Sequence, residues 1–149
     1  MAYETELSYR RSAITGASPI GLVIALYDTL SGDLRRAATA IRGNDIERRC
    51  HELNHATLVL GQLENWIDKD SGEELAGNLA TFYTYVRSKM LEASFKKSAG
   101  VLDDLIELVL QVRTAWQQRD SASAQQSMTP RVPSMVSASG TRAVFSQTA

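Results

Sequence analysis

The chain of 149 residues has little cysteine, little proline and no long apolar run, and each shortage excludes a class of protein. Cys50 is the only cysteine, so an intramolecular disulfide is impossible. No uninterrupted apolar run reaches the roughly 18 residues that a membrane-spanning helix needs, and the N-terminus lacks the apolar centre of a secretory signal. We therefore expect a soluble, cytoplasmic protein that does not insert into membranes.

An excess of one charge is also missing. The chain carries 16 basic and 17 acidic residues, for a formal net charge of -1. A balanced chain has no general electrostatic attraction to nucleic acid or to an anionic membrane. We therefore expect no nucleic-acid partner. The 44% of apolar residues and 22% of charged residues are typical of one ordinary globular domain.

The scarcity of proline favours long helices. The three prolines are Pro19, Pro130 and Pro133, so residues 20–129 contain none of the residue that most strongly stops a helix. Apolar residues recur at steps of three and four over most of this stretch, which is typical of amphipathic helices. The pattern predicts four helices, at about residues 19–42, 45–68, 73–97 and 101–119.

Capping residues define the first two of these helices. Ser18 is a suitable N-cap, and Pro19 occupies the first helical position, whose amide has no partner to lose. Gly43 and Asn44 are typical of a helix end followed by a turn. Asn44 also stands three residues before Glu47, as in a capping box, so we expect Asn44 to cap the second helix.

Four amphipathic helices with short connections predict an all-α protein, an antiparallel up-down four-helix bundle. The bundle is expected to span residues 18–119, after a flexible N-terminal segment at 1–17. Residues 120–149 are mostly Ser, Ala, Thr and Gln without a sustained apolar period, which is typical of a disordered tail.

The second helix contains the pattern H-E-x-x-H, from His51 to His55, which in zinc peptidases supplies two metal ligands and a general base. A third ligand is missing, because no other histidine exists and Leu58 and Gly61 do not fit the extended motif. Helical geometry at 100° per residue predicts that both histidines point away from the bundle. A zinc hydrolase is therefore a disfavoured alternative: we expect no metal, no cofactor and no catalytic residues, and we interpret Cys50 as a small buried hydrophobe.

Four stretches, in order, carry a resemblance to a known family. They are "TGASPIGLVIALYDTLSGDLRRAATAI", "HATLVLGQLENWID", "GEELAGNLATFYTYVRSKMLEAS" and "VLDDLIELVLQVRTAW". Over roughly residues 3–119 the chain resembles the flagellin-specific export chaperones, the FliS family. The order and spacing of the four stretches match the helices predicted independently.

The resemblance implies a binding protein and not an enzyme. Members hold newly made flagellin in the cytoplasm, prevent its early polymerisation and keep it competent for flagellar type III export. The implied partners are the disordered C-terminal segment of flagellin and, as a further candidate, the flagellar export gate. A related bundle with another secreted client or regulator is the alternative, and we allow for a weak homodimer.

The resemblance also implies an apolar groove that receives the client as an amphipathic helix. It further implies that the segment before the first long helix lies in this groove when the client is absent. An alternative interpretation of Tyr27, Tyr83 and Trp116 is that they pack at the edge of the core. The residues expected to bind the client are Tyr3, Tyr9, Leu22, Leu26, Tyr27, Leu79, Tyr83 and Tyr85.

Overall fold

The computed structural model describes residues 18–70 and 72–128. It contains four helices over these residues: α2 (Pro19–Arg42), α3 (Ile46–Asp70), α4 (Glu73–Lys96) and α5 (Ala99–Met128). The predicted all-α class is confirmed. The predicted flexible segment at 1–17 and residues 129–149 of the predicted tail lie outside the described residues.

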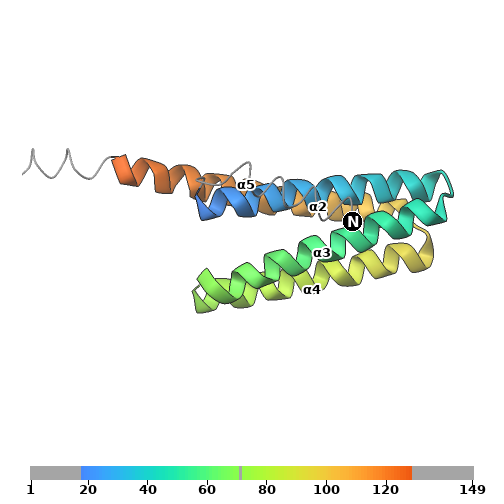
Figure 1. Cartoon of the computed structure of the whole chain (residues 1–149), viewed down its shortest axis with the longest axis horizontal. Coiled ribbons are helices and arrows are strands. Elements are labelled where there is room, and N and C mark those ends of the chain that lie inside the picture. The colour runs from blue at the N-terminus through green and yellow to red at the C-terminus, as the bar shows by residue number, and fades with distance from the viewer. Residues whose placement is uncertain (1–17, 71, 129–149) are drawn as a thin grey trace, which may run out of the picture.

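The helices alternate in direction and form an antiparallel up-down bundle (Figure 1). α2 packs against α3 and α5, and α4 packs against the same two helices, so the four form a ring. Figure 1 shows that the α2/α5 pair and the α3/α4 pair lie close together where α2 connects to α3 and diverge toward the opposite end. We call these two ends the closed end and the open end.

Side-chain size explains this divergence. Near the closed end the core contains small residues, including Ala37, Ala38 and Ala93, which are almost completely buried and let helices approach closely. Toward the open end the core instead contains or contacts bulky aromatic side chains, among them Trp66 and Trp116. Helices separated by aromatic rings cannot approach as closely as helices separated by methyl groups. The shape of the bundle therefore follows from where the large residues stand.

The turn between α2 and α3 corrects one predicted cap. Ser18 caps α2 as expected, since its Oγ accepts the Gly21 N–H at 3.0 Å. Asn44, however, takes a left-handed conformation with φ of 56°, which suits asparagine at the end of a helix. Asp45 is the residue that caps α3, because its Oδ1 accepts the Arg48 N–H at 3.0 Å.

The last helix is longer than predicted. α5 begins at Ala99, where Ser98 Oγ accepts the Val101 N–H, and continues to Met128 instead of ending at Arg119. Residues 120–128 contain no proline or glycine, and Ala and Gln are good helix formers. A helix that is already formed extends easily through such a sequence, because each added residue gains one backbone hydrogen bond without a new nucleation step.

Candidate functional site

A pocket of about 290 Å³ opens between the helices at the open end of the bundle. All four helices contribute to it: the first turns of α2 and α4, and the later turns of α3 and α5. Most of the lining is apolar. The lining residues are Pro19, Ile20, Val23, Leu63, Trp66, Ile67, Gly72, Leu75, Leu79, Tyr83, Trp116 and Arg119.

A pair of buried tyrosines closes the inner end of this pocket. The hydroxyl groups of Tyr27 and Tyr83 are 2.9 Å apart and hydrogen-bonded, and the two rings lie 6.3 Å apart in a tilted arrangement. Burial raises the pKa of both hydroxyls, so both stay neutral at physiological pH. The pair links α2 to α4 across the ring of helices and fixes the depth of the pocket.

Trp116 and Arg119 of α5 form one wall. The guanidinium of Arg119 lies 6.0 Å from the centre of the Trp116 ring, which is a cation–π distance. The indole N–H of Trp116 lies close enough to the Tyr27 hydroxyl to lower the pKa of that hydroxyl slightly against the larger effect of burial. The indole nitrogen is buried and has no hydrogen-bond acceptor of normal geometry among the described residues. An unsatisfied buried N–H is costly, and the Tyr27 hydroxyl is the neighbouring group that offsets this cost.

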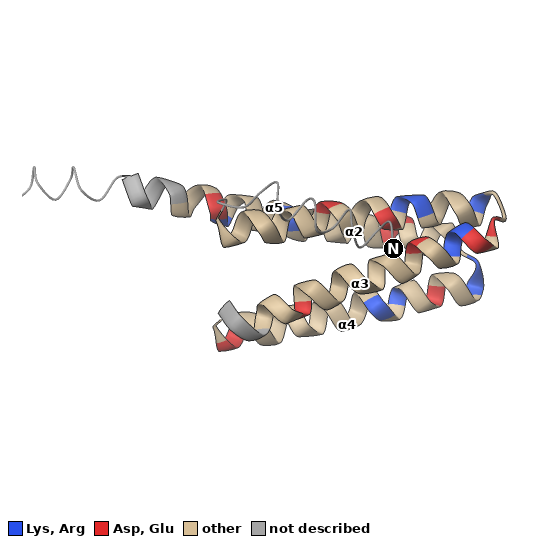
Figure 2. Cartoon of the chain, in the orientation of Figure 1, with Lys and Arg blue, Asp and Glu red and all other residues tan. Residues whose placement is uncertain are grey.

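The apolar surface continues out of the pocket between α4 and α5. A shallower depression of about 130 Å³ shares Leu75, Leu79, Trp116 and Arg119 with the pocket and adds Val112 and Ala115. Figure 2 shows that Lys and Arg gather toward the closed end of the bundle. The open end therefore combines a pocket for an apolar side chain with a groove along which a helix can lie.

The residues predicted from the sequence to bind the client lie in different parts of the bundle. Leu79 and Tyr83 line the pocket, and Tyr27 lies directly beneath it. Leu22 is half-buried and Leu26 is buried in the core, and neither lines the pocket.

Tyr85 is exposed on the other side of α4. There the ammonium of Lys89 lies 5.6 Å from the centre of the Tyr85 ring, a cation–π distance, and both residues line a separate small depression. Tyr3 and Tyr9 lie outside the described residues. The open end thus gathers three of the eight predicted residues, Tyr27, Leu79 and Tyr83.

The sequence prediction missed most of the pocket walls. These residues are Pro19, Ile20, Val23, Leu63, Trp66, Ile67, Leu75 and Arg119, while Trp116 was considered only as an edge of the core. One signal was available, because both tryptophans of the chain line this pocket. Each stands near the end of a predicted helix, where a large aromatic residue contributes little to a fully buried core.

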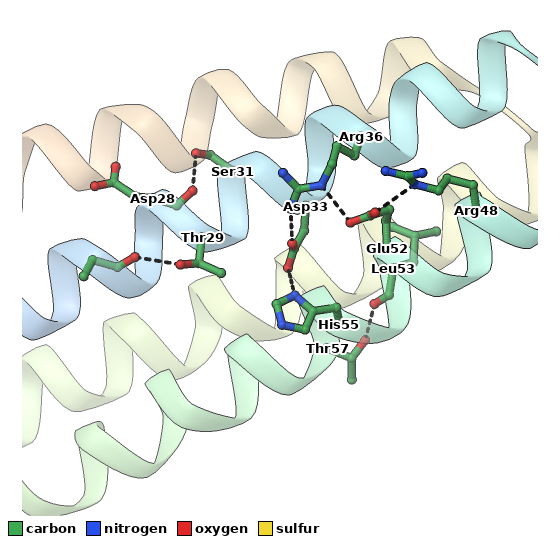
Figure 3. A network of polar contacts seen from close by, with 11 residues as sticks. Asp28, Thr29, Ser31, Asp33, Arg36, Arg48, Glu52, Leu53, His55 and Thr57 are labelled. Atoms are coloured by element: carbon green, nitrogen blue, oxygen red, sulfur yellow. Dashed lines mark hydrogen bonds and ion pairs between the residues drawn. The ribbon is translucent and has the colours of Figure 1, made fainter. Parts of the chain in front are cut away.

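The H-E-x-x-H stretch belongs to a structural network and not to the open end (Figure 3). His51 is exposed as predicted, but the prediction for His55 is wrong: the residue is 3% exposed, and its Nδ1 lies 2.6 Å from Asp33 Oδ2 on α2. α3 is covered by α2 on one side and by α4 on the other, so its buried arc is wider than its apolar stripe. The hydrogen bond with Asp33 offsets the free-energy cost of burying the imidazole of His55.

Arginines complete the network. Arg36 donates to Asp33 Oδ1 at 2.7 Å and to Glu52 Oε1 at 3.0 Å, and Arg48 donates to Glu52 Oε2 at 3.1 Å. Glu52, which would be the general base in the zinc-peptidase motif, is fully buried here and accepts hydrogen bonds from both arginines. Burial raises the pKa of Asp33 to about 6 against the opposing effects of His55 and Arg36.

No metal centre emerges from these residues. Within the part of the chain that the structure describes, no three or more His, Cys, Asp or Glu side chains are grouped to hold a metal ion. His51 and His55 point to different environments, one to solvent and one into the α2–α3 interface. Cys50 is exposed, which corrects its interpretation as a small buried hydrophobe.

Comparison with known proteins identifies the family. A family model described as "Flagellar protein FliS" matches residues 1–123. The chain belongs to the FliS family. It is 27% identical to the flagellar secretion chaperone FliS of Bacillus subtilis over 74% of this chain and 82% of that protein.

Two further FliS-family proteins show similar agreement. The chain is 29% identical to the flagellar secretion chaperone FliS of Salmonella typhimurium, over 78% of this chain and 87% of that protein. It is 28% identical to the flagellar secretion chaperone FliSB of Pseudomonas aeruginosa, over 69% and 82%. Among the described residues, no helix has the length and apolarity to cross a membrane.

Proposed function

We propose that this protein is a cytoplasmic chaperone that binds the disordered C-terminal segment of flagellin and keeps it unpolymerised for export. The observation that supports this best is the apolar pocket at the open end, lined by both tryptophans and continued by a groove between α4 and α5. The pocket's position in a FliS-family bundle gives that segment a suitable site. The chain acts by binding and needs no catalytic group.

The size of the site fits one anchor and a helical continuation. A volume of about 290 Å³ is at the lower end of small-molecule pockets, roughly 300–1,000 Å³, so it accepts one or two large side chains and not a whole helix. Coupled folding of a disordered segment buries about 1,000–3,000 Å² and loses about 2–5 kcal/mol in ordering. The groove beside Val112 and Ala115 supplies part of that additional contact.

Leu75 is the best residue for a test, because it lines both the pocket and the groove and is only half-buried. A peptide from the C-terminal end of the same organism's flagellin is titrated calorimetrically into the full chain. We expect saturable binding with a negative heat-capacity change, weakened at least about tenfold by Leu75→Ala. The matched control is Leu58→Ala, the same chemical change at a half-exposed site on α3 that lines neither depression.

Each outcome of the titration is informative. Equal affinities for the wild type and Leu75→Ala place the client elsewhere on the chain and reject the open-end site. An absence of heat at two well-separated temperatures with a folded wild-type chain rejects flagellin as the client and favours another secreted client. Delivery to the flagellar export gate is the last step of the proposal, and a strain carrying Leu75→Ala should secrete less flagellin than a strain carrying Leu58→Ala.

A further inference from the structure

One charged residue stands where the open-end pocket meets the groove between α4 and α5. Among the described residues that line these two depressions, Arg119 alone carries a charge, and it lines both. Its side chain is exposed and makes no ion pair with any residue that the structure describes. Most arginines of the bundle are paired with a carboxylate: Arg36, Arg42, Arg48, Arg87 and Arg113.

The ring of Trp116 holds the guanidinium of Arg119 in place. The two groups are 6.0 Å apart, and a cation on an aromatic face is attracted by the electrons of the ring. A planar guanidinium that is already oriented in this way loses little further freedom when it forms hydrogen bonds. Its N–H donors are spaced to match the two oxygens of a carboxylate. The α5 wall therefore presents an oriented donor group beside an apolar surface.

The acidic residues that the structure describes at this end of the bundle have other places. The carboxylate of Asp120 accepts a hydrogen bond from the Ser18 hydroxyl at 2.8 Å, which ties it to the start of α2. Glu73 and Glu74 are exposed in the first turn of α4, where they favour the helix dipole, and neither lines the pocket or the groove (Figure 2). A carboxylate of the client is thus attracted at the α5 wall and repelled at the start of α4.

We propose that Arg119 selects client segments that carry an aspartate or a glutamate beside the residue that enters the pocket. This inference rests on the proposed function and names the chemistry of the client. Because Arg119 lines both the pocket and the groove, the bound segment continues on either side of it. The partner is therefore a side-chain carboxylate within the segment and not the carboxylate of its last residue.

The pair should discriminate between clients more than it adds affinity. Exposed ion pairs contribute little, but a client that covers Trp116 also removes water from around the guanidinium. Arginine is one of the residues enriched among the contacts that dominate protein interfaces. The apolar contacts, among them those of Leu75, supply most of the binding free energy, and loss of the charge pair should weaken binding about fivefold.

Calorimetric titration of the full chain with the C-terminal flagellin peptide of the same organism tests the proposal. Arg119→Gln should weaken binding about fivefold, and its exposed position makes the fold insensitive to the change. Each acidic residue of the peptide is then replaced in turn by its amide. One replacement should weaken binding to the wild type as much as Arg119→Gln does, and should have no further effect on that variant.

Two controls separate charge recognition from packing. Arg35→Gln is the same chemical change at an exposed arginine of α2 that lines neither depression, and it should leave the affinity unchanged. Raising NaCl from about 50 mM to about 500 mM should weaken binding to the wild type and affect Arg119→Gln much less. If Arg119 only supported the Trp116 ring, its loss would weaken binding equally at both salt concentrations and with every peptide.

The outcomes distinguish this inference from the proposed function. The inference is overturned if Arg119→Gln binds as tightly as the wild type, or if no acidic side chain of the peptide is coupled to Arg119. It is also overturned if the coupled group is the terminal carboxylate, which a peptide with an amidated C-terminus reveals. In these cases the proposed function stands as long as the wild type binds and Leu75→Ala does not bind as tightly. A peptide that fails to bind the wild type rejects both.

Discussion

Replacing Asp33 by asparagine should change how the stability of the protein depends on pH. Asp33 is fully buried, and burial raises its pKa from 3.8 to about 6 although His55 and Arg36 oppose the rise. A carboxyl group with a raised pKa contributes stability that is fully present below the unfolded value and is lost as the pH rises through about 6. At about 1.4 kcal/mol for each pKa unit, the loss amounts to about 3 kcal/mol.

Asparagine resembles the protonated form of Asp33 in shape and in lack of charge. As the pH rises from about 4 to about 7, the wild type should therefore lose up to about 3 kcal/mol in its free energy of unfolding relative to Asp33→Asn. Urea unfolding at several pH values measures this difference directly. Asp103→Asn is the control, because Asp103 is a partly exposed carboxylate paired with Arg42, and its substitution should change stability by less than about 1 kcal/mol.

The opposite trend would refute this reasoning. If Asp33→Asn loses stability relative to the wild type as the pH rises, then Asp33 is ionised in the folded protein and its pairing outweighs the cost of burial. His55 at 2.6 Å and Arg36 at 2.7 Å would then hold a charged carboxylate. The network would be a buried ion pair, in which removal of one partner is strongly destabilising.

Three other substitutions test the remaining structural conclusions. Tyr27→Phe and Tyr83→Phe should each cost about 1–2 kcal/mol in urea unfolding, because each leaves the other buried hydroxyl without its partner, while the double variant should cost less than the sum; strictly additive losses would contradict the bond. His51→Ala should change stability by less than about 0.5 kcal/mol and leave elemental analysis of the purified protein without zinc, since His51 is exposed. Bound zinc that disappears with His51→Ala would revive the metal-site alternative.

The sequence alone predicts the helices of this bundle because their signals are local. Ser18 and Pro19 mark the start of α2, and the absence of proline from residues 20–129 permits four long helices. The errors arise where a choice depends on distant partners or on closely balanced alternatives. Asn44 and Asp45 are both good capping residues, and only the left-handed conformation of Asn44 assigns the cap to Asp45.

The burial of His55 shows the limit of helical periodicity. A hydrophobic stripe locates the centre of the buried arc of a helix, but its width depends on how many neighbours cover that helix. α3 has two, and the side facing α2 accepts polar residues because Asp33 and Arg36 provide partners there. Asp33 stands 22 residues before His55, and Arg36 stands 16 residues before its partner Glu52, so no local pattern reveals these contacts.

The open-end pocket was difficult to predict for a different reason. Periodicity assigns a residue to a face of its own helix, whereas membership of this pocket depends on the level along the bundle at which the residue stands. Tyr83 shows that one residue can belong to both the core and the pocket. This tyrosine is 1% exposed and is hydrogen-bonded to Tyr27, and it also lines the pocket. The aromatic residues that hold the helix pairs apart are thus the same residues that line the space between them. In this bundle a substitution of a buried residue at the open end should change packing and binding together, whereas the half-buried Leu75 can be changed with less effect on the core.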